Sequence, residues 1–124
     1  MIKSLVSLSA LLMTLCIQSD YFQNTSRPLI IAHRGAAGMI PEHSLQAYST
    51  AAFMKSDFIE PDVVFSKDNH MVCMHQPWLS LTTDVADRPE FASRKREVIW
   101  AGKPRHDWFT FDFTLEELRT LKLV

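Results

Sequence analysis

Short apolar runs along this chain alternate with polar segments, and three of the runs end in residues with reactive side chains. Residues 29–35 (Leu-Ile-Ile-Ala-His-Arg-Gly) predict a buried strand that carries a histidine and an arginine at its C-terminal end. Gly35 provides the backbone freedom for a sharp exit or a close approach to a ligand. Residues 58–65 predict a second strand, and residues 71–74, which lead into His75, predict a third.

A helix is predicted between the first two strands. Pro41 and Glu42 mark its start, because proline is tolerated in a first turn and an acidic residue there complements the helix dipole. An apolar stripe at helical spacing follows, formed by Leu45, Tyr48, Ala51 and Ala52. Residues 55–57 end the helix. The order strand, helix, strand predicts a parallel βαβ unit.

The rest of the chain predicts shorter elements. Residues 66–70 form a turn, so the third strand is either the return strand of a hairpin or a closely following neighbour. The run 94–96 (Arg-Lys-Arg) is interpreted as a solvated face rather than a binding patch. Phenylalanines alternate over residues 109–113, which is a strand-like period. Thr114 and Glu117 have the spacing of a capping box, which predicts a helix that continues to the region of Val124.

Composition limits the class of protein. The chain has 124 residues, of which 47% are hydrophobic and 22% charged, as in an ordinary globular domain. The formal net charge of −1 gives no electrostatic case for binding nucleic acid or an anionic membrane surface. The sequence predicts no particular oligomeric state.

The N-terminus predicts a targeting segment. Residues 1–19 have a short positive start, an uncharged apolar core and small residues at the end, which favours a signal peptide over an uncleaved anchor or a buried helix. The protein is then secreted, or periplasmic in a bacterium, with no stable membrane insertion after cleavage. Residues 20–27 form a flexible lead-in to a domain over residues 28–124, with a glycosylation sequon at Asn24. Cys73 is interpreted as a small buried apolar residue.

Two carboxylates lie on the second strand. Glu60 and Asp62 are two residues apart, so both side chains point to one face of an extended chain. Carboxylate oxygens without nearby cysteines favour a hard ion, magnesium or calcium. The alternatives are that the pair faces solvent on an edge strand, or that it forms a plain ion pair with Arg34.

The strand ends also carry two histidines and an arginine. His33 and His75 could act as acid and base across a phosphodiester, because histidine titrates near neutral pH, although a lone histidine is usually structural. Arg34 could hold phosphate oxygens bidentately, or form a salt bridge with Glu60 or Asp62.

Several ordered motifs together resemble the glycerophosphodiester phosphodiesterase family, in its longer secreted or periplasmic branch. These motifs are His33–Gly38, Pro41–Ser44, Asp57–Val63, Ser66–Asp68, His75, Leu81–Asp84 and Thr110–Leu118. The resemblance implies a TIM-type (β/α)8 barrel of the phospholipase C-like phosphodiesterase kind, with the site at the strand ends.

The resemblance also implies roles for individual residues. His33 and His75 match the acid/base pair, with the base of the first step left unassigned. Arg34 matches a phosphate-contacting arginine, and Glu42 a glutamate close to the site. Glu60 and Asp62 match two of three carboxylates that bind a divalent cation, calcium or magnesium. The substrate is a small glycerophosphodiester, which the family hydrolyses to glycerol 3-phosphate and an alcohol. A glycerol hydroxyl attacks phosphorus first, and water opens the cyclic intermediate.

The chain departs from the family pattern in three ways. Pro61 separates the two carboxylates, Gln76 stands where aspartate is common, and a closed barrel needs about 250 residues. The sequence therefore predicts the N-terminal portion of such an enzyme, with an open sheet edge and little or no activity by itself. One alternative is a degenerate member that acts as a binding or regulatory protein. Another is a related barrel enzyme, such as a phospholipase D-like toxin or a phosphoinositide-cleaving lipase, which residues 67–68 and 82–84 argue against.

Overall fold

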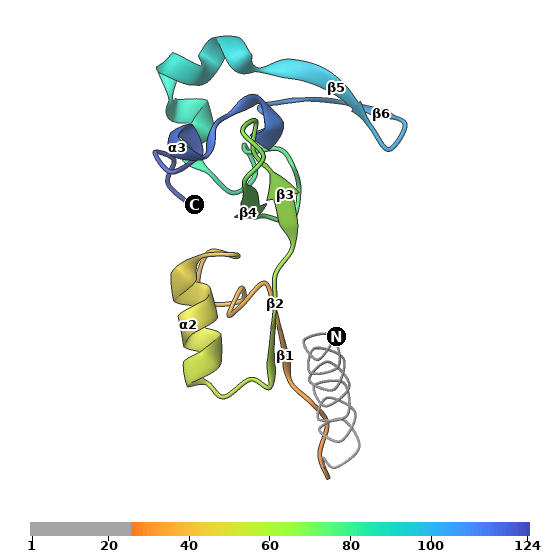
Figure 1. Cartoon of the computed structure of the whole chain (residues 1–124), viewed down its shortest axis with the longest axis vertical. Coiled ribbons are helices and arrows are strands. Elements are labelled where there is room, and N and C mark those ends of the chain that lie inside the picture. The colour runs from red at the N-terminus through yellow and green to blue at the C-terminus, as the bar shows by residue number, and fades with distance from the viewer. Residues whose placement is uncertain (1–25) are drawn as a thin grey trace, which may run out of the picture. The chain divides into compact units, whose positions relative to one another are not determined.

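The computed structural model describes residues 26–124 (Figure 1). The chain divides into two compact units, Met1–Ile30 and Ile31–Val124, and every helix and strand described here lies in the second. The predicted signal peptide and most of the predicted lead-in lie outside the described residues. Within residues 26–124, no helix has the length and apolar character needed to cross a membrane.

The predicted βαβ unit is confirmed. Strand β1 (Ile31–His33) and strand β2 (Phe58–Glu60) pair in parallel, and helix α2 (Leu45–Phe53) connects them beside the pair (Figure 1). The register places His33 opposite Glu60 at the C-terminal ends of the two strands. Parallel pairing thus brings two of the predicted site residues to one edge.

Helix α2 begins later than predicted. Ser44 is its N-cap and accepts a hydrogen bond from the Ala47 N–H at 3.0 Å, whereas His43 has a left-handed φ of 58° that no helical residue adopts. The predicted apolar stripe is only partly confirmed: Ala51 is buried, but Leu45 is 77% exposed and Ala52 is exposed, and the buried Ala47 was not included. Two alanines on the inner face let the helix backbone approach the strands closely.

The predicted second strand is divided in two. After β2, Pro61 and Asp62 interrupt the pairing, and β3 (Val63–Phe65) then pairs antiparallel with β4 (Met71–Cys73). Proline has no N–H to donate, which accounts for the break. The third strand is therefore the return strand of a hairpin, and Asn69 in its turn has a φ of 62°, as asparagine tolerates. Cys73 is exposed, so its interpretation as a buried residue was wrong.

Two 3₁₀ helices follow and pack on a small core. Helix η1 (Asp84–Asp87) is capped by Thr83, and helix η2 (Pro89–Arg94) begins with a proline. The Trp108 Nε1–H donates a hydrogen bond of 2.6 Å to the Phe91 carbonyl of η2. The buried side chains of the core are Met74, Leu79, Val85, Phe91, Trp108 and Phe113.

An antiparallel hairpin that the sequence analysis did not predict comes next. Strand β5 (Arg96–Trp100) pairs with β6 (Lys103–Asp107), and Ala101 and Gly102 form the turn with φ values of 49° and 78°. Most residues of both strands are exposed, so the hydrophobic alternation that marks a half-buried strand is missing.

The C-terminal part of the chain is less regular than predicted. Residues 109–113 do not form a strand, because η3 (Thr110–Asp112) brings Phe109 and Phe113 into the interior, both with 0% exposure. Helix α3 (Leu115–Leu118) has the predicted capping box of Thr114 and Glu117, but it ends well before Val124.

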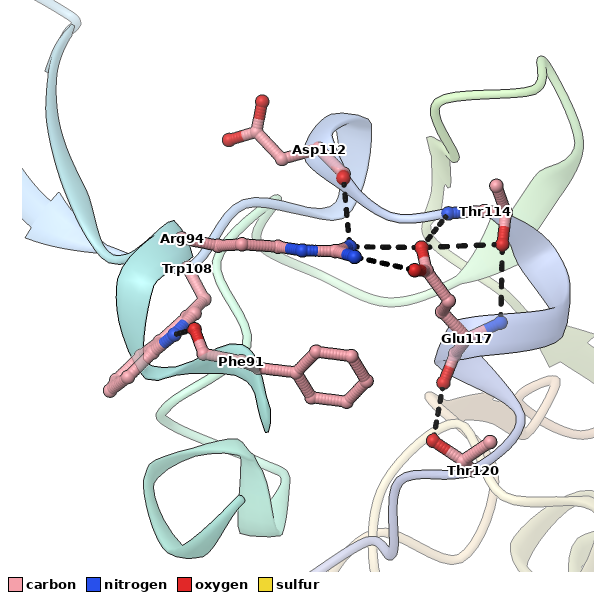
Figure 2. A network of polar contacts seen from close by, with 7 residues as sticks. All are labelled: Phe91, Arg94, Trp108, Asp112, Thr114, Glu117 and Thr120. Atoms are coloured by element: carbon pink, nitrogen blue, oxygen red, sulfur yellow. Dashed lines mark hydrogen bonds and ion pairs between the residues drawn. The ribbon is translucent and has the colours of Figure 1, made fainter. Parts of the chain in front are cut away.

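A network of polar contacts joins η2 to α3 (Figure 2). The Arg94 guanidinium donates two hydrogen bonds to the Glu117 carboxylate, at 2.6 and 2.9 Å, and Glu117 also accepts from the Thr114 N–H. These contacts, and the hydrogen bond from Arg94 most of all, lower the pKa of Glu117 to about 2. Arg96 pairs with Asp112. The basic run is therefore not simply a solvated face, because two of its residues make ion pairs.

Candidate active site at the ends of β1 and β2

The site is built on the turn that follows β1. The Arg34 N–H donates to the Glu60 carbonyl at 3.0 Å and lies 3.3 Å from Glu60 Oε2, which continues the β1–β2 pairing by one residue. Arg34 itself has a left-handed φ of 59°. This backbone conformation turns the chain and keeps the arginine side chain beside the end of β2.

Gly35 makes the sharp exit that the sequence predicted, and the close approach that it permits is to helix α2. Its φ is 82°, and a Cβ placed on it would lie 2.8 Å from the backbone carbon of Ala47 and 3.0 Å from the Ala47 Cβ. Real side chains do not approach so closely. Only glycine therefore permits this turn to pack against α2, and the packing fixes the position of Arg34.

The Arg34 side chain lies between two carboxylates. Its Nη1 donates to Glu42 Oε2 at 2.8 Å, and its Nε lies 3.4 Å from Asp62 Oδ2 without hydrogen-bond geometry. The ion pair predicted with Asp62 is present, and the one with Glu42 was not anticipated. Since no described residue bonds Nη2, that nitrogen of the half-buried guanidinium remains able to bind an anion.

The two predicted histidines differ in their surroundings. His33 lies with its Nε2 3.9 Å from Glu60 Oε2, and its side chain is 69% exposed. His75 is exposed and makes no hydrogen bond or ion pair with the other site residues among those described. It follows Met74, whose N–H donates to the Asp62 carbonyl at 3.1 Å, so the backbone next to His75 is tied to that of Asp62.

The structure adds a third histidine, to which the sequence analysis gave no role. His43 is buried, with its side chain 3% exposed, and its Nε2 lies 3.2 Å from Asp62 Oδ2. Its Nδ1 lies 2.7 Å from the Tyr48 hydroxyl. A histidine in a loop before a helix gives no signal of its direction, so the sequence could not have identified this contact.

Tyr48 remains protonated in this setting. Burial raises the pKa of its hydroxyl, and its hydrogen bond and charge interaction with Cys73 raise it further. The hydroxyl is therefore available as a hydrogen-bond partner for His43 at neutral pH.

The carboxylates suit a hard cation by their chemistry. The Arg34 guanidinium faces the carboxylates of Glu42 and Asp62, and the Arg34 backbone N–H faces that of Glu60. Three carboxylates thus surround one arginine, so negative charge exceeds positive charge in this region. Oxygen donors of this kind are the ligands of calcium and magnesium. No group of three or more His, Cys, Asp and Glu side chains in residues 26–124 is arranged to hold a metal by itself. The donors present thus fit part of a cation site that needs further ligands.

The described elements define a class of fold: they form part of a TIM-type α/β barrel, and the described residues contain no closed barrel. A model of the glycerophosphoryl diester phosphodiesterase family matches residues 33–123. The chain belongs to this family.

Sequence relatives of known function support this family membership. Glycerophosphodiester phosphodiesterase GDPD6 of Arabidopsis thaliana is 50% identical over 97 residues, which cover 78% of this chain and 26% of that relative. A glycerophosphodiester phosphodiesterase of Haemophilus influenzae is 37% identical over 101 residues, or 82% of this chain and 25% of the relative. This chain thus spans about a quarter of the length of these curated relatives.

Solved structures show the same fold. An Oleispira antarctica phosphodiesterase in complex with the product sn-glycerol-3-phosphate aligns with a TM-score of 0.56 and 30% identity, over 76% of this chain and 30% of that one. A glycerophosphodiester phosphodiesterase from Agrobacterium tumefaciens aligns with a TM-score of 0.55 at 24% identity, over 77% of this chain and 32% of that one.

Proposed function

We propose that this chain provides part of the active site of an enzyme that hydrolyses glycerophosphodiesters to sn-glycerol 3-phosphate and an alcohol. The observation that carries the proposal is the family match over residues 33–123, which includes all six predicted site residues. The product named for the Oleispira antarctica phosphodiesterase supports the same substrate class.

Arg34 is the phosphate-binding residue in this proposal. Its Nη1 and Nε face Glu42 and Asp62, which fix the plane of the guanidinium, and its Nη2 is directed to a non-bridging phosphate oxygen. A guanidinium held in this way binds a phosphodiester without first having to lose its side-chain freedom.

His33 and His75 exchange protons with the substrate. One accepts the proton of a glycerol hydroxyl as that oxygen attacks phosphorus, and the other gives a proton to the oxygen of the departing alcohol. The products of this step are a cyclic phosphodiester and the alcohol. Water then opens the ring, with the two histidines exchanging roles. Their assignment to the two roles is left open.

Glu60 and Asp62 would hold a divalent cation, calcium or magnesium, together with further ligands that do not come from residues 26–124. When bound, such an ion neutralises charge on the phosphate and orients it. The contribution of this chain is to place both carboxylates next to Arg34 at the strand ends. We also propose that residues 1–19 direct secretion, so the substrate is met outside the cytoplasm.

Two proteins test the proposal: the 124-residue chain alone and a chimera with the Arabidopsis relative. The 124-residue chain alone is expected to give no turnover. Residues 31–124 placed in the corresponding segment of the Arabidopsis relative are expected to release sn-glycerol 3-phosphate from a panel of glycerophosphodiesters, observed by ³¹P NMR. Either a silent chimera or one that cleaves other phosphodiesters instead would refute the proposed activity.

Single substitutions in the active chimera assign the roles. His33→Ala, His75→Ala and Arg34→Met are each expected to lower kcat at least about 100-fold, the usual contribution of acid–base catalysis. His106→Ala is the matched control, because His106 is an exposed histidine on β6 and should leave kcat unchanged.

The degenerate-member alternative has a separate outcome in the same assay. Pro61 was one reason to consider it, yet the break that follows β2 leaves Glu60 and Asp62 both within reach of Arg34. A chimera that binds a glycerophosphodiester without turning it over would favour a binding protein.

A further inference from the structure

A hydrogen-bonded chain of side chains connects helix α2 to Asp62, and the proposed chemistry above does not use it. It runs from the Tyr48 hydroxyl to His43 Nδ1 at 2.7 Å, and from His43 Nε2 to Asp62 Oδ2 at 3.2 Å. A carboxylate can only accept, so the hydrogen on Nε2 is directed at Asp62. In the contact between His43 and Asp62, His43 Nε2 is therefore the donor and Asp62 Oδ2 the acceptor.

The histidine at the centre of this chain is rigidly held. Its side chain is 3% exposed, and both ring nitrogens have partners. The backbone N–H of His43 donates to the Arg34 carbonyl at 3.1 Å. The imidazole ring packs edge-on against the Tyr48 ring, with centroids 6.2 Å apart. The backbone hydrogen bond, the contact with the Tyr48 ring and the two ring-nitrogen contacts together hold the imidazole in one orientation. Its Nε2–H therefore points in one direction, toward Asp62.

The two oxygens of Asp62 are consequently not equivalent. Oδ2 faces both His43 Nε2 and Arg34 Nε, at 3.2 and 3.4 Å, while Oδ1 has no hydrogen bond or ion pair among the described residues. The hydrogen bond from His43 and the ion pair with the Arg34 guanidinium meet on one oxygen and so restrict the rotation of the carboxylate. The other oxygen is then the one left to face a ligand.

We propose that His43, supported by Tyr48, is a positioning residue that fixes the Asp62 carboxylate with Oδ2 held and Oδ1 presented to the site. Histidine and carboxylate groups that orient a ligating side chain typically change metal affinity by about 10–100-fold when removed. The orientation of Asp62 is inferred from its contacts with His43 and Arg34. Its effect on a bound cation rests on the proposed function.

The experiment measures the side-chain rotamer of Asp62 in the whole 124-residue chain by three-bond couplings to its Cγ in NMR. The parent chain is expected to show one χ1 rotamer. His43→Gln keeps an N–H donor in reach of Asp62 and is expected to keep that rotamer, whereas His43→Leu removes the donor and is expected to show averaging. His70→Leu is the matched control, because His70 contacts Asp68 at 3.3 Å on an exposed turn away from Asp62.

Tyr48→Phe provides a second variant if His43→Leu fails to fold. It keeps the ring and removes only the hydroxyl that holds His43 Nδ1, so it is expected to raise the population of a second Asp62 rotamer above that of the parent. An averaged rotamer in the parent, or an unchanged single rotamer in every folded His43 and Tyr48 variant, would overturn the positioning role.

A titration with Mn²⁺ separates this inference from the proposed function. Paramagnetic broadening of the Asp62 signal is expected to need at least about 10-fold more Mn²⁺ in His43→Leu than in the parent or in His43→Gln. Equal midpoints in the parent and His43→Leu would refute an effect on the cation. If the parent shows no broadening at Asp62, the cation-binding role of Asp62 is wrong, and the rotamer measurement still decides whether His43 positions it.

Discussion

Replacing Glu117 with glutamine removes one negative charge from the contact between η2 and α3 and leaves the local packing in place. Glutamine has nearly the same volume, and its amide oxygen can still accept from the Thr114 N–H as the capping box requires. What is lost is the charge that faces the Arg94 guanidinium through two hydrogen bonds (Figure 2). The substitution therefore removes the charge together with the Arg94 Nη2 hydrogen bond to Oε1, because the amide NH2 that replaces Oε1 cannot accept.

The size of the effect follows from the pKa of Glu117. The contacts with Arg94 and Thr114 lower that pKa from 4.5 to about 2, a difference that corresponds to about 3 kcal/mol before solvent is considered. The two side chains are 31% and 35% exposed, so water and salt screen the pair. We expect Glu117→Gln to lower the free energy of unfolding by about 1–2 kcal/mol at neutral pH.

The pH dependence has a definite sign. A carboxyl whose pKa is lowered in the folded state contributes stability above its unfolded-state pKa, and this contribution disappears as the pH falls through its folded-state pKa. For Glu117 the interval lies between 4.5 and about 2. The parent chain and Glu117→Gln should differ fully at neutral pH, differ progressively less within that interval, and converge at its acidic end.

Urea unfolding of both chains, followed by tryptophan fluorescence at stepwise lower pH, measures this difference. Glu116→Gln is the matched control, because Glu116 lies in the same first turn of α3, is exposed and has no partner among the described residues. An equal loss of stability in Glu116→Gln would show that the helix dipole is responsible rather than the pair. A difference that stays constant down to the acidic end of the interval would refute the assigned cause.

Four further substitutions test turns, a helix cap and core packing, each by urea unfolding. Gly35→Ala should cost about 2–3 kcal/mol, because its Cβ would collide with the Ala47 backbone as well as strain a positive φ. Gly102→Ala shares the positive φ but meets open space, so it should cost only about 1 kcal/mol, and equal losses would refute the collision. Ser44→Ala removes the N-cap of α2 and should cost about 1 kcal/mol, with faster hydrogen exchange at the Ala47 amide; unchanged exchange would contradict this. Trp108→Phe removes the buried hydrogen bond to the η2 carbonyl and should cost about 1–3 kcal/mol, and a loss below that range would mean that water replaces the bond.

Elements that follow from local rules could be predicted from the sequence. The β1–α2–β2 unit was predicted because apolar runs bracket a helical pattern, and the capping box was predicted because a threonine precedes a glutamate at the right spacing. The start of α2 was wrong because the proline and acidic-residue rules compete with the stronger N-cap of Ser44. Residues 109–113 fit both a strand period and one 3₁₀ turn, and only tertiary burial decides between the two.

One neighbour pair of the candidate site follows from the sequence, but the other contacts of the site do not. Placing His33 and Glu60 at one edge follows from parallel strands, so their proximity could be inferred. The contact of Arg34 with Glu42 and the burial of His43 depend on the path of a loop with three residues of positive φ, which no periodicity encodes. The β5–β6 hairpin was missed because its strands are mostly exposed and its turn lacks asparagine or aspartate.

The left-handed backbone at Arg34 and His43 makes the site a place where stability and activity compete. Their φ values of 59° and 58° each cost about 1 kcal/mol or more in a residue with a side chain, and glycine at either position would relieve that cost. Selection for a more stable chain alone sets this relief against the contacts of each side chain: Arg34 pairs with Glu42, and the buried His43 contacts both Asp62 and Tyr48. A screen that scores only folding yield should therefore accept glycine more often in place of Arg34, whose side chain is 18% exposed, than in place of His43, whose side chain is 3% exposed, whereas a screen that scores cleavage should exclude it in place of Arg34.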